Sequence, residues 1–241
     1  YSVRPYGVDQ FPASLGPSEL YARDKFIFVY QDVRGRYMSE GEFTLTRPYK
    51  PIKDGPKDTD ETSDASDTID WLVKNVPGNS GRVGMWGVSQ PGFFVSAAMI
   101  DAHPALIAVS PQAPVTDYYL GDDSYHNGAF MLAHRFRFYQ GFKQRDGDPS
   151  PPPPPPPGVD LGTPDGYEFF LNLGSLANAE EKYFKRQQPF WTAHMENTSY
   201  TEFWKSRSIW RHFKGIKPAV LTVGGWFDQE DPMGPLRTFK E

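Results

Sequence analysis

One serine in this chain stands where its hydroxyl could act as a nucleophile. Ser89 lies in the stretch RVGMWGVSQPGFF, where a β-rich apolar run meets a helical one. A serine that ends a strand and enters a helix through glycines lies in a sharp turn that exposes its hydroxyl. Gly87 and Gly92 remove side chains that would crowd such a turn, and the backbone N–H of Gln90 can donate to an oxyanion. The usual motif has glycine where Pro91 stands, so a structural serine in a strand-to-helix turn stays an alternative at this point.

The segments around Ser89 alternate between strand-like and helix-like patterns. Short apolar runs predict strands over 25–32, 82–88, 105–111 and 217–226. We expect the first of these to be a core strand, buried on both faces. Apolar residues at helical spacing predict helices over 65–76 and 91–102. This alternation is typical of a parallel sheet in an α/β fold.

The pattern changes in the middle of the chain, where aromatic-rich stretches such as HNGAFMLAHRFRFYQGF have helical spacing and little β-branching. We interpret this region as an inserted helical cap. The expected organisation is the first part of the core at 1–113, the cap at 114–213, and the rest of the core, with its return strand and acid loop, at 214–241. Seven consecutive prolines in the loop 149–158 favour a stiff polyproline II segment, either a surface linker or a peptide-docking site.

Composition excludes several classes of function. The chain has 241 residues, of which 38% are hydrophobic, enough for one sizeable core. A formal charge of -5 provides no basic field for nucleic acid, and no apolar run is long enough to cross a bilayer. The absence of cysteine rules out disulfides and thiolate metal sites but fits either redox compartment. No ligand-like spacing of histidines suggests a metal, and no cofactor is expected.

Five stretches of the chain, taken in order, resemble one enzyme family. They are QDVRGRYMSEGEF, DTIDWLVKN, GRVGMWGVSQPGF, LGDDSYHNGAF and GGWFDQED. In these stretches the chain is similar to the α-amino acid ester hydrolases and their relatives, the cocaine esterases and X-prolyl dipeptidyl peptidases. The resemblance implies an α/β-hydrolase fold with an inserted helical cap, and a C-terminal jelly-roll domain that these residues do not include.

The resemblance also implies the catalytic roles. Ser89 matches the acylated serine, and Asp228 matches the acid that orients the catalytic histidine. Gln90 stands where these enzymes usually have tyrosine, and its backbone N–H would be one oxyanion donor. The other donor in the family is a tyrosine hydroxyl in a TPY segment. Tyr1 is our preferred match for it, and Tyr6, in RPY, is the alternative.

A cluster of carboxylates binds the ammonium group of the acyl donor in the α-amino acid ester hydrolases. The matching positions here are Asp123, Glu230 and Asp231, and all three are acidic. Converging acids repel one another unless they hold a cation. Isolated acidic pairs are more commonly solvated loop charges, but the position of these beside the nucleophile's partner strand favours an ammonium site.

The histidine of the triad is the main gap. In α/β-hydrolases it follows the acid, yet every histidine of this chain precedes Asp228. The five are His103, His126, His134, His194 and His212. We expect the chain to be a fragment whose catalytic histidine lies outside it, with recruitment of another histidine as the alternative. His103 is interpreted as a helix end and His212 as a surface residue, whereas His126 and His134 could line the pocket.

The sequence therefore predicts a serine hydrolase or acyltransferase that forms an acyl-enzyme on esters or amides of α-amino acids, with β-lactam side-chain acyl groups among the candidates. An X-prolyl dipeptidyl peptidase, a general carboxylesterase and a non-catalytic binding module are the alternatives. The expected partners are a small-molecule ester or amide and the remainder of the same polypeptide, and a homo-oligomer stays open. Neither nucleic acid nor membrane is expected, and the resemblance slightly favours a periplasmic or secreted protein.

Overall fold

The computed structural model describes residues 1–8, 15–55, 57–142, 144–145, 147–153 and 158–241. Five short parallel strands form its centre: β1 (Ser2–Arg4), β2 (Tyr30–Asp32), β3 (Val83–Val88), β4 (Leu106–Gln112) and β7 (Ala219–Val220). Four helices belong to the segments that also contain these strands: α1 (Glu19–Arg23), α2 (Glu61–Asn75), α3 (Gln90–Ala98) and α9 (Met233–Lys240). Within the described ranges, no helix has the length and apolar character needed to cross a bilayer.

The strands form one parallel arrangement in the order β2-β1-β3-β4-β7. Ladders join β1 to β2, β3 to β4, and β4 to β7. The first residue connects the two groups, because the amino group of Tyr1 donates to Gly84 O at 3.0 Å and Trp86 N donates to Tyr1 O at 3.2 Å. The parallel α/β sheet expected from the sequence is therefore confirmed.

Two helices pack on one face of this sheet. Helix α2 begins at a capping box in which Asp60 and Ser63 bind one another's backbone N–H, and it buries Ala65, Ile69 and Leu72. Helix α3 is apolar and all of its residues are buried. Thr62 Oγ1 of α2 donates to Ala97 O of α3 at 3.3 Å, which holds the two helices side by side. The nucleophile candidate therefore precedes the most deeply buried helix of the core.

Two predicted strands are shorter than expected. The segment 25–32 is a strand only over β2, and Phe26 and Ile27 are exposed, so the prediction of a strand buried on both faces is wrong. The reason is position, because β2 pairs only with β1 and lies at the edge of the described sheet. The return strand is regular only over β7, although Val223 continues the pairing with Gln112 of β4.

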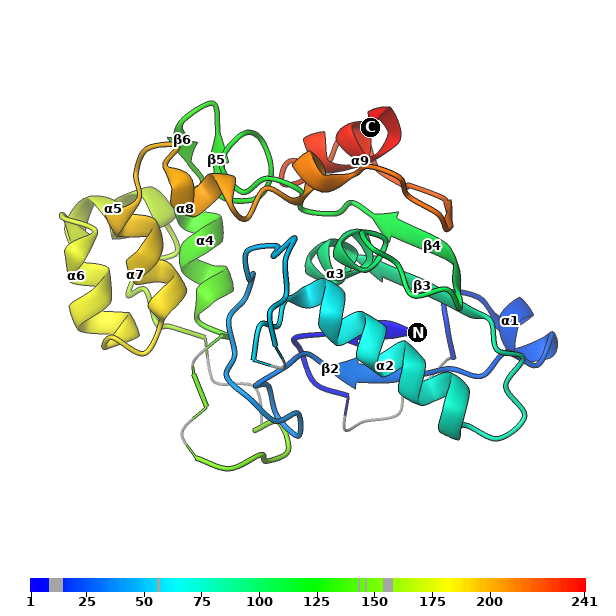
Figure 1. Cartoon of the computed structure of the whole chain (residues 1–241). Helices are drawn as coiled ribbons and strands as arrows, with labels where there is room; N and C mark the ends of the chain where they lie inside the picture. Colours follow the sequence, from blue (N-terminus) through cyan, green and yellow to red (C-terminus); the bar gives the residue numbers. More distant parts are fainter. Residues whose placement is uncertain (9–14, 56, 143, 146, 154–157) are drawn as a thin grey trace.

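The middle of the chain folds as helices at one end of the sheet. It contains α4 (Leu132–Tyr139), α5 (Gly166–Leu173), α6 (Ala177–Ala179), a π-helical turn (Glu180–Phe184), α7 (Pro189–Glu196), α8 (Glu202–Lys205) and a 3₁₀ turn (Ile209–His212). A small hairpin, β5 (Tyr125–His126) with β6 (Ala129–Phe130), precedes them. In Figure 1 the arrows of β2 and β4 point toward these helices, which therefore lie at the carboxyl ends of the strands.

The helical segment, residues 132–212, has an aromatic core of its own. The rings of Phe136 and Trp191 are fully buried and pack edge to face, and His194 lies between Tyr139 and Trp204. The segment thus has the helical character expected of a cap, while the domain boundaries at 113 and 213 stay predictions. Of the proline-rich loop 149–158, residues 154–157 lie outside the described residues.

One buried carboxylate joins the helical segment to the core. Asp117 follows β4 and is completely buried. Its Oδ1 accepts from the N–H groups of Tyr119 and Leu120, each at 3.0 Å. Its Oδ2 accepts from the end of the helical segment, namely from Tyr200 Oη, Ser208 Oγ and Trp210 Nε1 at 2.8, 2.8 and 3.1 Å. The orientation of the segment over the strand ends therefore depends on Asp117.

We predict that Asp117→Asn lowers the free energy of unfolding by about 3 kcal/mol, because an amide has one acceptor oxygen and leaves buried donors unpaired. Urea unfolding followed by fluorescence measures this change. Asp148→Asn is the matched control, since Asp148 is exposed, and we expect a change below about 0.5 kcal/mol. Equal stability of the two variants would contradict the role given to Asp117.

Candidate active site

Ser89 occupies a strained turn between β3 and α3. Its φ is 62° and its ψ is -124°, a conformation that residues with a side chain rarely adopt. The turn is held on both sides, because Ser89 N donates to Gln112 O of β4 at 2.9 Å and Ser89 O accepts from Phe93 N at 3.0 Å. Its hydroxyl makes no hydrogen bond to the described residues. The strain is typical of a turn that presents a nucleophile at the end of a strand.

The two glycines around Ser89 are required by close backbone contacts. A Cβ at Gly87 would lie 2.5 Å from the carbonyl carbon and oxygen of Pro91, in the first turn of α3. A Cβ at Gly92 would lie 2.7 Å from Gln112 O. Both distances are shorter than carbon atoms tolerate, so the turn can close only without these side chains. Glycine at position 92 therefore meets a packing requirement although Pro91 replaces the more usual glycine.

Gln90 combines a free backbone donor with a fully buried side chain. It is the first residue of α3, so its N–H has no partner within the helix and points out of the helix N-terminus. Its side chain faces the core, where Nε2 donates to Leu45 O at 3.1 Å and Oε1 accepts from Tyr118 Oη at 2.5 Å. The glutamine side chain thus fixes the start of the helix and leaves the N–H available.

The structure does not bring Tyr1 close to the turn between β3 and α3 that contains Ser89. Tyr1 precedes β1 and lies beside Gly84 and Trp86 of β3, whereas Ser89 follows the end of that strand. The Tyr1 hydroxyl donates to Gln31 instead, in a polar cavity of about 290 Å³ beside α2 whose lining does not include Ser89. The predicted oxyanion role of Tyr1 therefore does not fit its position.

Tyr6 lies nearer to the acidic residues of the site. It follows β1, at the end of the sheet where Ser89 also lies. Its side chain is about half exposed, and the burial of the rest, followed by the charge of Asp123, raises the pKa of its hydroxyl to about 12. The hydroxyl is therefore protonated at neutral pH and can donate a hydrogen bond.

Asp228 lies in a loop at the same end of the sheet. Val223 pairs with Gln112 of β4, and the carbonyl of Gln112 also accepts from Ser89 N. The loop after Val223 therefore leaves the sheet beside the turn that contains Ser89. Within this loop Asp228 Oδ1 accepts from Glu230 N at 2.9 Å and from Asp231 N at 3.1 Å. Its Oδ2 makes no hydrogen bond to the described residues. The acid predicted to orient a histidine thus also orders the loop that carries two further acids.

The three acids of the predicted ammonium site are brought together by the fold. Asp123 and Asp231 are almost completely buried, and Asp123 N donates to Glu230 O at 2.7 Å. Burial, followed by the charge of Asp123, raises the pKa of Glu230, and the same two causes raise the pKa of Asp231 well above its usual range. Asp231 Oδ1 has no hydrogen-bond partner among the described residues. The reading of these acids as solvated loop charges is therefore wrong for Asp123 and Asp231.

Arg135 of α4 is the cation that this cluster already contains. Its side chain is fully buried, and its guanidinium binds Asp123 Oδ1 at 2.5 Å. Its charge also acts on the other two acids, whose pKa values it lowers against the effect of burial. Arg135 could not be singled out from the sequence, because no local pattern distinguishes a buried arginine of a helix from an exposed one.

Asp122 fixes the two acid-bearing loops relative to one another. Its Oδ2 accepts from the N–H groups of Thr116 and Asp117 and from the Thr116 hydroxyl, at 3.0 to 3.1 Å. Its Oδ1 accepts from Met233 N and Gly234 N, at the start of α9, at 3.2 and 2.8 Å. One side chain therefore connects the loop before Asp123 to the loop that contains Glu230 and Asp231.

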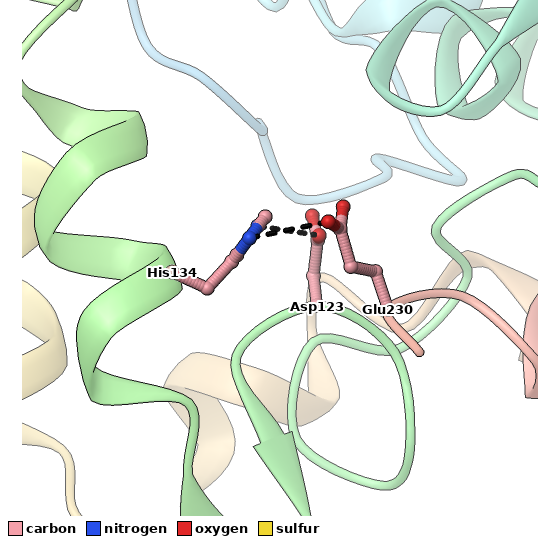
Figure 2. Close-up of side chains that lie close together, drawn as sticks. All are labelled: Asp123, His134 and Glu230. Atoms are coloured by element: carbon pink, nitrogen blue, oxygen red, sulfur yellow. Dashed lines mark ion pairs between the residues drawn. The ribbon is translucent and has the colours of Figure 1, made fainter. Parts of the chain in front are cut away.

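His134 of α4 projects toward two of these acids, as Figure 2 shows. Its Nδ1 lies 3.2 Å from Glu230 Oε1 and its Nε2 lies 3.8 Å from Asp123 Oδ1. Ligand atoms of these three residues fall within 4.8 Å of one another, a spacing that a metal ion could bridge. However, the two nitrogens of His134 face different carboxylates, and Arg135 already binds Asp123 Oδ1. We therefore do not identify the trio as a metal site.

The remaining histidines have other partners. His126 Nε2 lies 3.2 Å from Glu230 O, so His126, like His134, borders the acidic cluster. His194 is fully buried, contacts Ser124 and Tyr139, and has its pKa lowered by burial to about 3. His103 accepts from Ala105 N. None of the five histidines, all of which are described, hydrogen-bonds Ser89 or Asp228.

Comparisons with known proteins agree with this geometry. Residues 1–241 match the family model described as X-Pro dipeptidyl-peptidase, S15 family. The chain belongs to this family. A cocaine esterase of Rhodococcus sp. (strain MB1 Bresler) is 25% identical over 227 residues, which are 86% of this chain and 34% of the esterase.

Two solved structures of this family's fold resemble the chain. An aminopeptidase from a marine sediment Thaumarchaeota archaeon has a TM-score of 0.78 and 33% identity over 91% of this chain and 35% of that structure. An α-amino acid ester hydrolase has a TM-score of 0.78 and 34% identity over 92% of this chain and 35% of that structure. The predicted α/β-hydrolase fold and the suspected family are thereby confirmed. The chain spans about a third of the length of these relatives.

We predict that Gly87→Ala destabilises the protein by about 3 kcal/mol, since the added methyl group would meet the backbone of Pro91. Gly84→Ala, in the same strand, is the matched control, because a Cβ there would lie 3.8 Å from its nearest neighbour. Urea unfolding compares the two variants. If Gly84→Ala were as destabilising as Gly87→Ala, the tight-turn argument would be wrong.

Proposed function

We propose that this chain carries the nucleophile and the amine-binding site of a serine hydrolase that acts on esters or amides of α-amino acids. The observation that supports the nucleophile most strongly is the backbone of Ser89, whose φ of 62° is held by Gln112 and by α3. In the proposed reaction Ser89 Oγ loses its proton to a histidine and attacks the substrate carbonyl carbon. The tetrahedral intermediate expels an alcohol or amine, and water or another amine then takes the acyl group.

The proposed general base is a histidine supplied by the rest of the polypeptide. Two observations support this: no histidine of the chain hydrogen-bonds Ser89 or Asp228, and the chain spans about a third of its relatives' length. Asp228 would orient that histidine through Oδ2, because Oδ1 is engaged by the loop.

The proposed oxyanion donors are the N–H of Gln90 and the hydroxyl of Tyr6. The N–H opens α3, where the helix dipole also favours negative charge. Tyr6 replaces Tyr1 in this role because the hydroxyl of Tyr1 donates to Gln31 of β2. Tyr6, in contrast, lies close enough to the cluster for Asp123 to affect its titration.

The substrate class is proposed from the charge of the acidic cluster. Arg135 pairs with Asp123, and Glu230 and Asp231 lie close enough for Asp123 to affect their titration, so the ionised cluster retains formal negative charge that an ammonium group would balance. A unit charge pair at about 4 Å is worth on the order of 4 kcal/mol at an effective dielectric near 20. A free α-amine is also present in the dipeptidyl substrates that the family description names, so an X-prolyl peptidase is the second candidate. Comparing amino-acid esters with Xaa-Pro amides separates the two.

We predict that Ser89→Ala in the full-length protein reduces kcat by several orders of magnitude, because no other group can form the acyl-enzyme. A fluorophosphonate probe should label Ser89, as detected by mass spectrometry of the tryptic peptide. Ser80→Ala, at an exposed loop position of the same region, is the control and should keep labelling and activity. Activity retained in Ser89→Ala, with labelling elsewhere, would show that the nucleophile is another residue.

We predict that a phenylglycine methyl ester reacts at least tenfold better in kcat/KM than the same ester without its α-amino group. A tenfold preference requires only about 1.4 kcal/mol, a fraction of the charge-pair energy. Glu230→Gln should reduce the preference and largely spare the amine-free ester. The preference should also fall at high pH, where the substrate amine loses its proton.

The exposed Glu181 provides the matched control for that experiment, and Glu181→Gln should leave the preference unchanged. Equal rates for the two esters in the unmodified enzyme would reject the amine site and favour a general carboxylesterase.

A further inference from the structure

The imidazole of His134 faces two carboxylates at once. Nδ1 lies 3.2 Å from Glu230 Oε1 and Nε2 lies 3.8 Å from Asp123 Oδ1, so each nitrogen has a different acidic neighbour (Figure 2). Nε2 is buried and makes no hydrogen bond to the described residues. A neutral imidazole has one N–H and can donate to one of these carboxylates, whereas an imidazolium has two and suits both.

The charges around His134 come from three elements. Asp123 precedes the β5–β6 hairpin, Glu230 precedes α9, and Arg135 and Arg137 are its neighbours on α4. Its ring also stacks with that of Phe138, with centroids 6.2 Å apart. Burial, followed by the charge of Arg135, lowers the pKa of His134 below its ordinary 6.5. The histidine is therefore mainly neutral at neutral pH and gains its proton only as the pH falls below that ordinary value.

When Asp231 is protonated, one additional positive charge is enough to neutralise the cluster. The raised pKa of Asp231 favours its protonated form. As long as Asp123 and Glu230 are both ionised, they carry two negative charges, and Arg135 balances one of them. Either an ammonium group or the imidazolium of His134 can balance the other. Both cations would use the same carboxylate oxygens, so they repel one another and compete.

We propose that His134 is a pH-dependent counter-ion that excludes amines: once protonated, it occupies Asp123 and Glu230 and displaces the ammonium group of the substrate. This inference rests on the proposed amine site and adds a specificity-determining residue to it. Its consequence is that selectivity for amine-bearing substrates is lost in mildly acidic solution and gained as His134 loses its proton. Selectivity should then fall again at high pH, where the substrate itself becomes neutral.

The test uses phenethylamine as a competitive inhibitor of the full-length enzyme, with the amine-free ester as substrate. This simple primary amine, like a lysine side chain with its pKa of about 10.4, stays protonated between pH 5 and pH 7.5. Any change of inhibition over this pH range therefore comes from protonation of groups of the enzyme and not of the inhibitor. We expect the inhibition constant to fall several-fold between pH 5 and pH 7.5 in the unmodified enzyme, and by less than half that factor in His134→Gln, which cannot become charged.

Two further variants separate this effect from other titrations. Asp231→Asn should keep most of the pH dependence, since the competing histidine is still present. His212→Gln, at another half-buried histidine that contacts the ring of Tyr49, should behave as the unmodified enzyme does.

A pH dependence that persists in His134→Gln, or disappears in Asp231→Asn alone, would overturn the role of His134 and leave the amine site standing. Absence of inhibition by phenethylamine at pH 7.5 would overturn both the amine site and this inference.

Discussion

The geometry of the site depends on one buried carboxylate, that of Asp122. It accepts hydrogen bonds from Thr116 and Asp117 on one side and from Met233 and Gly234 on the other. These contacts hold two acidic loops against one another although their own charges repel. The approach is so close that a Cβ at Gly234 would lie 1.7 Å from Pro114 O. The like-charged residues therefore cannot separate without breaking buried hydrogen bonds to the backbone.

Backbone strain occurs at both parts of the site. Ser89 and Asp123 have φ values of 62° and 56°, and each is held by a hydrogen bond from its own N–H, to Gln112 O and Glu230 O respectively. Such conformations persist only where the surrounding structure fixes them. For Ser89 the fixing element is α3, whose complete burial opposes any opening of the turn.

The two parts of the molecule contribute different chemistry. The α/β core provides Ser89, the N–H of Gln90 and Asp228, which are the groups used in the proposed acyl transfer. The helical segment provides His134 and Arg135, which determine the charge of the acidic cluster. Because Asp117 joins the segment to the core, the positions of Ser89 and of the acidic cluster relative to one another depend on the same buried connection.

The sequence by itself determined the α/β class, the elbow at Ser89 and the acidic stretches, because hydrophobic periodicity, glycine spacing and motif order are local properties. It did not determine the length of the strand at 25–32, since burial depends on whether a neighbouring strand covers it. It also could not place Tyr1 and Tyr6 relative to Ser89, because the position of each residue along the sheet is set by pairing with β3.

Only the tertiary structure decided which charges meet. Arg135 and Asp123 are close in sequence, but Glu230 reaches them from a distant loop, and no local pattern encodes the 3.2 Å between it and His134. Whether an acid is a solvated loop charge or part of a buried site depends on the low dielectric and the neighbours that folding supplies. For Asp123 and Asp231 that environment exists only once the helical segment and the loop before α9 have packed onto the ends of the strands.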